Sequence, residues 1–207
     1  MARDTRAAIV DAAAEHLRRG DATFTYDGLA AEAGVARQTL YTRFPDRAEL
    51  IVSAVEQLRA EVADLETLTS AVQLAATALD ALEALLDLHL QLTPPLLDAL
   101  RAVEGQRALS PGLSEAFEHR SRGRRHLVRL VVTRLAAEGQ LAPGMSVDEA
   151  ADLLGALLTG TFTAELLRER GWTATQLRDA LGRLLAHGLL APPRPRGASP
   201  TNPGGPS

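Results

Sequence analysis

Apolar residues along most of this chain recur every three or four positions, which is the spacing of a helix with one buried face. The pattern predicts helices over residues 4–19, 25–33, 37–43, 46–65, 70–92, 96–108, 146–170 and 173–187. Residues 113–138 form either one long helix or two, with Gly123 as the weak point. Aromatic residues make up only 3% of the chain, so Leu, Ala and Val must build the core. Since Ala and Leu are strong helix formers, we predict an all-α fold.

Capping residues mark where these helices begin and end. Thr25 is expected to cap the second helix, and Gly34 to end it in a left-handed turn. Ser110 followed by Pro111 is typical of a helix start. Three further pairs have the spacing of a capping box, and they are Asp46 with Glu49, Ser146 with Glu149, and Thr173 with Gln176.

Composition narrows the function classes. The chain has no Cys, which excludes disulfides and thiolate metal sites. Its net charge of −4 argues against a protein coated with nucleic acid, but allows a small local DNA-binding face. The chain has no run of about 18 apolar residues, so no membrane span is predicted. Charged residues interrupt the N-terminus where a signal peptide would lie. We therefore expect a cytoplasmic protein.

Motifs for catalysis are absent from the sequence. It has no phosphate-binding glycine loop, no H-E-x-x-H and no nucleophile motif. The five histidines are scattered, and only His119 and His126 share a helix face. We expect no enzyme activity, no metal and no cofactor.

Residues 25–50 have the pattern of a helix-turn-helix DNA reader. Gly34 allows a tight turn between two short helices, and an inward set holds them at a fixed angle: Leu29, Ala33, Val35, Leu40 and Phe44. The outward face of the second helix offers hydrogen-bond donors to base edges and phosphates, from Arg37, Gln38, Thr39, Thr42 and Arg43, with Tyr41 aimed at the DNA backbone. The alternative is a surface helical hairpin with incidental arginines.

The stretch LAAEAGVARQTLYTRFPDRAEL, residues 29–50, resembles the DNA-binding signature of TetR-family transcriptional regulators. The resemblance covers about the first 50 residues. It implies phosphate contacts from Thr25 and Tyr26, a recognition helix that carries Arg37, Thr39, Tyr41 and Thr42, and a backbone grip from Arg47, where the family usually has Lys. Two positions depart from the family pattern. Ala36 replaces the usual Ser cap, and Gln38 replaces a common Gly and adds a candidate base contact.

The same resemblance implies the domain organisation and the homodimer. We expect a helix-turn-helix domain over 1–47, a helical effector-binding and dimerisation domain over 48–190, and a disordered Pro- and Gly-rich tail over 191–207. In this family the last two helices pair with their twins. The dimer residues expected here are Leu153, Gly155, Gly160, Leu177, Leu181 and Leu184. Without the resemblance, these apolar stripes are ordinary core.

A ligand cavity within the middle helices is also implied by the resemblance. Its candidate residues are Leu86, His89, Phe117, His126, Thr159 and Phe162. A lone His on an apolar stripe, such as His89, is more often a hydrogen-bonded core residue. A lining of Leu and Ala suits an apolar or amphipathic effector. The basic run from Arg120 to Arg129 is interpreted as a solvated face paired with acids such as Glu56, Glu61, Asp64 and Glu66; an anionic-ligand site or a second nucleic-acid contact is the alternative.

The resulting hypothesis is a sequence-specific DNA-binding regulator that binds a near-palindromic operator as a homodimer and responds to a small molecule. A repressor is the favoured form, although an activator would use the same reader. Two rivals stay open: a helical scaffold that no longer reads DNA, and an enzyme in the helical body.

Overall fold

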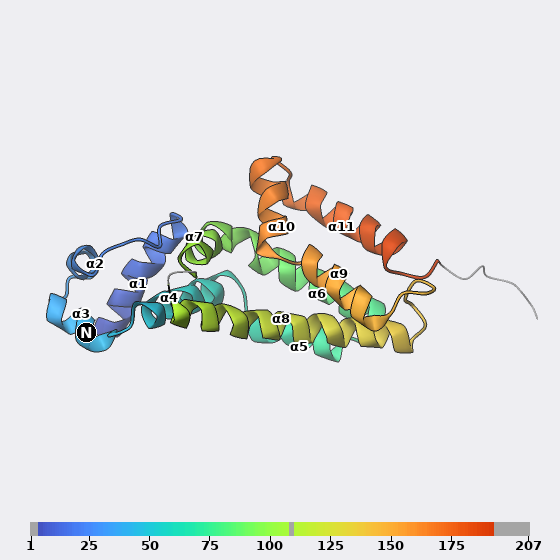
Figure 1. The fold of residues 1–207 in the computed structure, drawn as a ribbon, viewed down its shortest axis with the longest axis horizontal. Coiled ribbons are helices and arrows are strands. Elements are labelled where there is room, and N and C mark those ends of the chain that lie inside the picture. The colour runs from blue at the N-terminus through green and yellow to red at the C-terminus, as the bar shows by residue number, and fades with distance from the viewer. Residues whose placement is uncertain (1–3, 108–109, 193–207) are drawn as a thin grey trace, which may run out of the picture.

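The computed structural model describes residues 4–107 and 110–192. Within these ranges the chain forms helices and no strand, apart from one isolated bridge between Leu141 and Leu190. The all-α prediction is therefore confirmed. The molecule is elongated, with α1, α2 and α3 gathered at one end and the later helices forming a body at the other (Figure 1).

The N-terminal unit comprises α1 (Thr5–Arg18), α2 (Tyr26–Ala33) and α3 (Arg37–Arg43), and α4 (Arg47–Val62) leads from it into the body. The body contains α5 (Leu65–Leu74), α6 (Ala78–Leu92), α7 (Leu97–Arg107), α8 (Pro111–Ala137), α9 (Val147–Leu157), α10 (Gly160–Ala164) and α11 (Ala174–Gly188). A 3-10 turn, η1 (Pro94–Leu96), precedes α7, and a π-helical turn, η2 (Glu165–Glu169), follows α10.

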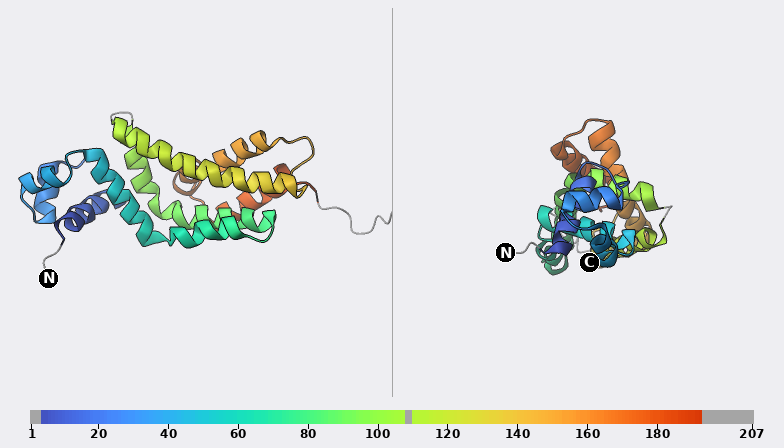
Figure 2. Two further views of the ribbon diagram at one scale, coloured as in Figure 1. Left: turned by 90° about the horizontal axis from the view of Figure 1, so that it is seen from below. Right: turned by 90° about the vertical axis from the view of Figure 1, so that its left-hand side faces the viewer.

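Buried apolar residues form two separate clusters. The first core joins α1–α4 with α7 and with the start of α8 at Leu113. The second core joins α5, α6, α9 and α11 with the later part of α8, from Val128 to Leu135. α8 runs as one long helix along the molecule, from near α4 to the far end of the body (Figure 2). Gly123 does not interrupt it, so residues 113–137 belong to one helix, which Glu138 caps.

The expected boundary after residue 47 lies inside the first core. α4 begins at Arg47, and its side chains Leu50, Ile51 and Leu58 pack in the same cluster as α1. α4 is therefore physically continuous with both the N-terminal unit and the body.

The prediction of one helix over 70–92 is wrong. α5 ends at Leu74, and α6 begins at Ala78 with a capping box. The Thr77 hydroxyl accepts from the Asp80 backbone N–H at 3.1 Å, and the Asp80 carboxylate accepts from the Thr77 N–H at 3.2 Å. This reciprocal capping satisfies backbone groups that a continuous helix would have paired internally.

The prediction of one helix over 146–170 is also wrong. α9 ends at Leu157, and the Thr159 hydroxyl caps α10 by accepting from the Phe162 N–H at 3.2 Å. The α9 segment and the segment over Gly160–Glu169 are bent by 44°. Among the described helices, none is by itself long and apolar enough to cross a membrane, although this bent pair meets the length and composition criteria when taken together.

Most predicted caps are confirmed. Thr25 accepts from the Gly28 N–H at 3.1 Å, and Gly34 has a φ of 68° in the left-handed region. The capping boxes at Ser146 and Thr173 form as expected. Asp46 caps α4 by accepting from the Ala48 N–H at 2.8 Å, but Glu49 does not complete that box and instead lies 3.6 Å from Arg6.

The end of the described chain is fixed to the loop after α8. The Ala191 N–H donates to the Gln140 carbonyl at 2.7 Å, and the Ala142 N–H donates to the Leu189 carbonyl at 2.9 Å. Ala191 and Pro192 are therefore held close to the body. The remainder of the predicted tail, and residue 108 at the expected end of α7, lie outside the described residues.

Candidate nucleic-acid interface

The angle between α2 and α3 is set by buried apolar side chains on their inner faces. Leu29 of α2, Leu40 of α3 and Phe44 just after α3 are fully buried. The Tyr26 hydroxyl donates to the Phe44 carbonyl at 3.0 Å, which joins the start of α2 to the end of α3. This framework holds α3 as a rigid element with one face free.

The free face of α3 carries hydrogen-bonding side chains. Gln38, Thr42 and Arg43 are exposed, together with Arg37 and Tyr41. Thr39 is half-buried, and the Thr42 hydroxyl donates to the Gln38 carbonyl at 2.8 Å. The segment from residue 36 to residue 44 contains no acid. The helix start has no side-chain cap at Ala36, as expected. A basic, donor-rich helix face of this kind suits the major groove of DNA.

Arg37 is held by neighbours from both helices. Its Nε lies 2.9 Å from a carboxylate oxygen of Asp27, and its guanidinium lies 5.4 Å from the ring centroid of Tyr41. A hydrogen bond to the Tyr41 hydroxyl at 3.5 Å, together with the charge of Asp27, raises the pKa of Arg37. The Tyr41 ring also packs edge-on against Tyr26 at 5.0 Å between centroids. Because the ion pair is exposed, it orients Arg37 without preventing contact with another anion.

Arg47 makes contacts that the sequence did not indicate. Its guanidinium donates to the carbonyls of Phe24 at 2.5 Å and Ala22 at 2.8 Å, and lies 4.3 Å from the Phe24 ring centroid. It thereby ties the link before α2 to the start of α4. The expected grip on the DNA backbone would compete with these bonds, so the geometry favours a positioning role for Arg47.

Tyr26 is likewise occupied within the protein through its bond to Phe44, and burial raises its pKa. Its hydroxyl oxygen can still accept a hydrogen bond, but its proton is directed at the Phe44 carbonyl. Thr25, by contrast, uses its oxygen as a cap acceptor and is exposed. Of the two expected phosphate contacts, Thr25 therefore has the freer donor.

A second unexpected cluster fixes α1 to α2. His16 lies 2.8 Å from Asp21 and 2.9 Å from Glu32, and its ring is 5.3 Å from that of Phe24. Hydrogen bonds from Thr23 and from His16 lower the pKa of Asp21 to about 2. These residues come from α1, from the link after it and from α2, so only the folded structure shows that they form one cluster.

The six candidate ligand residues do not form one site. Leu86 and His89 are buried on α6, and Phe162 packs against the second core. Phe117 instead packs against the first core, whereas His126 is exposed on the outer side of α8. His126 is therefore removed from the candidate lining.

His89 forms a closed hydrogen-bond chain. Thr163 donates to the Thr159 carbonyl at 3.0 Å, so the His89 Nε2–H must donate to the Thr163 hydroxyl at 2.8 Å. The Thr93 hydroxyl then donates to His89 Nδ1 at 3.1 Å. Burial, with a contribution from the charge of Arg124, lowers the pKa of His89 to about 4. His89 is thus a neutral, hydrogen-bonded core residue, and Thr159 serves its network as well as the α10 cap.

The expected dimer residues separate into two groups. Leu177 and Leu181 are fully buried in the second core and are therefore internal. Gly160 is half-buried, and a Cβ there would face Leu100 and Thr93 within the chain. Leu153 and Leu184 are large exposed apolar residues, and the space beside Gly155 is open.

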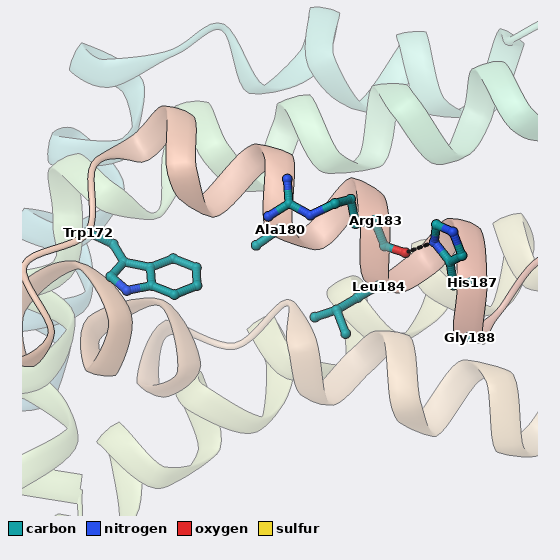
Figure 3. Close-up of a pocket in the computed structure, with 6 residues that line it drawn as sticks. All are labelled: Trp172, Ala180, Arg183, Leu184, His187 and Gly188. Atoms are coloured by element: carbon teal, nitrogen blue, oxygen red, sulfur yellow. Dashed lines mark hydrogen bonds between the residues drawn. The ribbon is translucent and has the colours of Figure 1, made fainter.

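Leu184 also lines an open surface pocket on α11. The other lining residues are Trp172, Ala180, Arg183, His187 and Gly188. Figure 3 shows the Trp172 ring beside α11, with Leu184 projecting from that helix. Trp172 and Leu184 thus share one exposed apolar surface, and Leu153 is exposed separately on α9.

Comparison with known proteins identifies this architecture. Residues 9–54, from α1 to the middle of α4, match the family model described as bacterial regulatory proteins, tetR family. The structure of NalD from Pseudomonas aeruginosa, the secondary repressor of the MexAB-OprM multidrug efflux pump, superposes with a TM-score of 0.68. It is 27% identical, with 90% of this chain and 95% of NalD covered. Residues 9–54 therefore match a tetR-family regulatory domain, and the chain as a whole shares the fold of NalD.

Other solved structures share the fold at lower identity. A putative transcriptional regulator from Saccharomonospora viridis, solved with choline, has a TM-score of 0.72 and 20% identity, with 89% of this chain and 97% of that chain covered. FadR from Bacillus subtilis, solved with stearoyl-CoA, has a TM-score of 0.68 and 19% identity, with 88% and 98% covered. Among curated protein sequences, none matches.

Proposed function

We propose that this chain is a ligand-responsive transcriptional repressor of the TetR family that acts as a homodimer on a near-palindromic operator in the cytoplasm. The observation that carries the proposal is the exposed, acid-free face of α3, held rigidly by Leu29, Leu40 and Phe44. Arg37, Gln38, Thr39, Thr42 and Arg43 supply base contacts, and Thr25 and Tyr41 contact phosphates. Arg47 and Tyr26 keep α3 in place.

A homodimer supplies the second recognition helix that a near-palindromic operator requires. Two recognition helices must lie about 34–36 Å apart to enter successive major grooves on one side of DNA. The exposed apolar residues Leu153, Leu184 and Trp172 give a surface through which two copies associate. Solvent-exposed Leu and Trp side chains such as these are typical of protein contacts.

The effector binds in the body and acts by population shift. A ligand that prefers a dimer with wrongly spaced recognition helices lowers operator affinity by its preference for that state. The choline complex of the Saccharomonospora viridis regulator and the stearoyl-CoA complex of FadR support small-molecule control in chains of this shape. The function requires no catalysis, and no cofactor is proposed.

α8 provides a direct route between the body and the N-terminal unit. A Cβ built on Gly112, at the start of α8, would lie 2.9 Å from the Ala48 Cβ and 3.3 Å from a carboxylate oxygen of Asp46. The start of α8 therefore presses against the start of α4, one residue after Arg47. We propose that a shift of α8 is transmitted through this contact to α4 and to the α3 framework.

The test is equilibrium binding by fluorescence anisotropy at fixed salt. One duplex carries the DNA upstream of the chain's own gene, and a second carries its scrambled sequence. We expect preferential binding to the first, protection of two half-sites about one helical turn apart, and loss of the preference in a double variant, Arg37→Ala with Arg43→Ala.

The charge-matched control is Arg101→Ala with Arg125→Ala, which removes two exposed arginines from α7 and α8. This control should bind like wild type. Equal affinity of wild type for both duplexes, across the regions flanking its gene, would favour the scaffold function instead.

A further inference from the structure

The inward face of α8 contains a polar interruption. Inward positions follow a three- and four-residue spacing along the helix, at Leu113, Phe117, Arg120, Arg124, Val128, Val131 and Leu135. Leu113 and Phe117 pack in the first core, and Val128, Val131 and Leu135 in the second. Arg120 and Arg124 therefore stand at core-facing positions in the interval between the two cores. The prediction that the whole Arg120–Arg129 run forms a solvated face is wrong for these two.

In the described part of the chain, neither arginine forms an ion pair with a carboxylate. The Nε of Arg124 is buried and has no hydrogen-bond partner among the described residues. Arg120 lies over the Phe117 ring at 4.5 Å, and across residues 4–107 and 110–192 no carboxylate approaches either guanidinium within ion-pair distance. Burial lowers the pKa of both arginines. An arginine remains charged under such conditions, so the interior holds two partly desolvated cations.

Neighbouring groups add to this positive charge. The charge of Arg59 on α4 further lowers the pKa of Arg120, outweighing the opposite effect of Glu56. Arg59 and Glu56 already pair with each other at 3.0 Å. On the α6 side, His89 is neutral and contributes no negative charge. The other arginines of the run do not share this environment, since Arg122 and Arg125 are exposed and Arg129 pairs with Asp148 at 2.6 Å.

We propose that the helical body binds an amphipathic anion, whose carboxylate or phosphate is held by Arg120 and Arg124 between the two cores and whose apolar part packs against the adjoining core residues. Guanidinium groups bind both oxyanions through paired N–H bonds, and a partly dry site strengthens those bonds. The inference rests on the proposed function, because this anion would be the effector. It narrows the expected effector class from apolar or amphipathic molecules to anions.

The first test needs no ligand. Replacing an unpaired, partly buried cation by an apolar side chain of similar length removes a desolvation cost. Arg124→Met should therefore raise the melting temperature of the ligand-free protein by about 2–4 °C. Arg122→Met, on the exposed side of the same helix, should leave it unchanged. A lower melting temperature for Arg124→Met than for Arg122→Met would show that Arg124 is a structural residue and overturn the proposal.

The second test measures binding by isothermal titration calorimetry with matched ten-carbon probes. Decanoate and decyl phosphate carry the anionic heads, 1-decanol is the neutral match, and decyltrimethylammonium is the cationic one. We expect at least one anion to bind the wild-type dimer. Arg120→Gln and Arg124→Gln should each weaken that binding by roughly ten-fold or more, since bonds to a charged group are strong, while Arg122→Gln should not. The affinities of decyl phosphate and decanoate are compared to identify the preferred head group.

Absence of binding by both anions, equal binding of decanol, or an equal loss in Arg122→Gln would overturn the proposal. The same preparations are titrated with operator DNA in the absence of probe. Loss of operator preference there would count against the proposed repressor function, whereas intact operator preference without anion binding would count against this inference alone.

Discussion

Arginines on α3 and on α8 lie in opposite surroundings. Arg37 and Arg43 project from an exposed face of α3, and Arg37 has an exposed ion pair with Asp27. Arg120 and Arg124 face inward on α8, where the Nε of Arg124 has no described partner. Both pairs follow from the same amphipathic spacing, since each helix turns one face to a core. The difference is which face the arginines occupy.

This difference separates two kinds of anion recognition. Water and salt screen an exposed arginine, which can exchange a weak protein partner for a DNA phosphate or base at little cost. A partly desolvated arginine has lost part of its hydration and gains most from a small anion that replaces it. The N-terminal unit is therefore suited to a large, mobile polyanion, and the body to a small enclosed one.

The framework and the contact face of α3 should respond differently to truncation. Phe44 is fully buried, so Phe44→Ala should lower the free energy of unfolding by about 3–5 kcal/mol. Tyr41 is 42% exposed, and Tyr41→Ala should change stability much less while weakening DNA binding. Urea unfolding and anisotropy on the same samples provide the check. Equal destabilisation by the two changes would mean that α3 has no distinct contact face.

Lowering the pH should destabilise the fold through the buried His89 of the body. The pKa of His89 is about 4 in the fold against 6.5 in the unfolded chain, so the unfolded state binds the extra proton first as the pH falls. Stability should be greatest above about pH 6.5 and should decline towards pH 4 by about 3 kcal/mol, at 1.36 kcal/mol per pKa unit. In His89→Gln, the pH slope in this window should be smaller. An unchanged slope would show that the interior beside Arg124 does not disfavour a second cation.

The tight contact between the start of α8 and the start of α4 leaves no room for an added methyl group. Gly112→Ala places a methyl group 2.9 Å from the Ala48 Cβ and should destabilise the protein by about 1–3 kcal/mol. Gly123→Ala is the matched control on the same helix, because nothing lies within 4 Å of its Cβ position. That control should be neutral or stabilising by about 0.5–1 kcal/mol. Restoration of stability by a second change, Ala48→Gly, would confirm the contact, and equal effects at Gly112 and Gly123 would exclude it.

The smallest expected effect concerns the cap of α2. Thr25→Ala removes the acceptor for the Gly28 N–H and should cost about 1 kcal/mol of stability. Thr25→Ser keeps both the cap and the exposed hydroxyl proposed to contact phosphate, so it should retain wild-type stability and DNA affinity. Circular dichroism during urea titration measures the first effect. Loss of affinity in Thr25→Ser would show that the methyl group, rather than the hydroxyl, matters.

Sequence alone predicted α3 well because local signals mark both of its ends. Gly34 must adopt positive φ, and Pro45 cannot continue a helix, so the element between them has little freedom. The breaks at Thr77 and Thr159 were missed because Leu and Ala continue on either side, and a single threonine gives a weak signal against such a background.

The inward arginines were missed for a different reason. Arg120 and Arg124 fit the spacing that runs from Leu113 to Leu135, but a hydrophobic pattern contains apolar residues only and so passes over both arginines. The contacts of Arg47 and His16 could not be predicted, since their partners lie at distances that no local periodicity reports. Tertiary packing decides which polar side chains become internal.

The central claim is that the α3 arginines bind DNA and the α8 arginines do not. The most direct measurement is operator affinity, by fluorescence anisotropy at one salt concentration and without effector, for two double variants of equal charge change. Arg37→Ala with Arg43→Ala should weaken binding at least roughly 30-fold, since each base contact contributes strongly to discrimination. Arg120→Gln with Arg124→Gln should bind like wild type. Near-wild-type affinity in the α3 variant, or a comparable loss in the α8 variant, would contradict the claim.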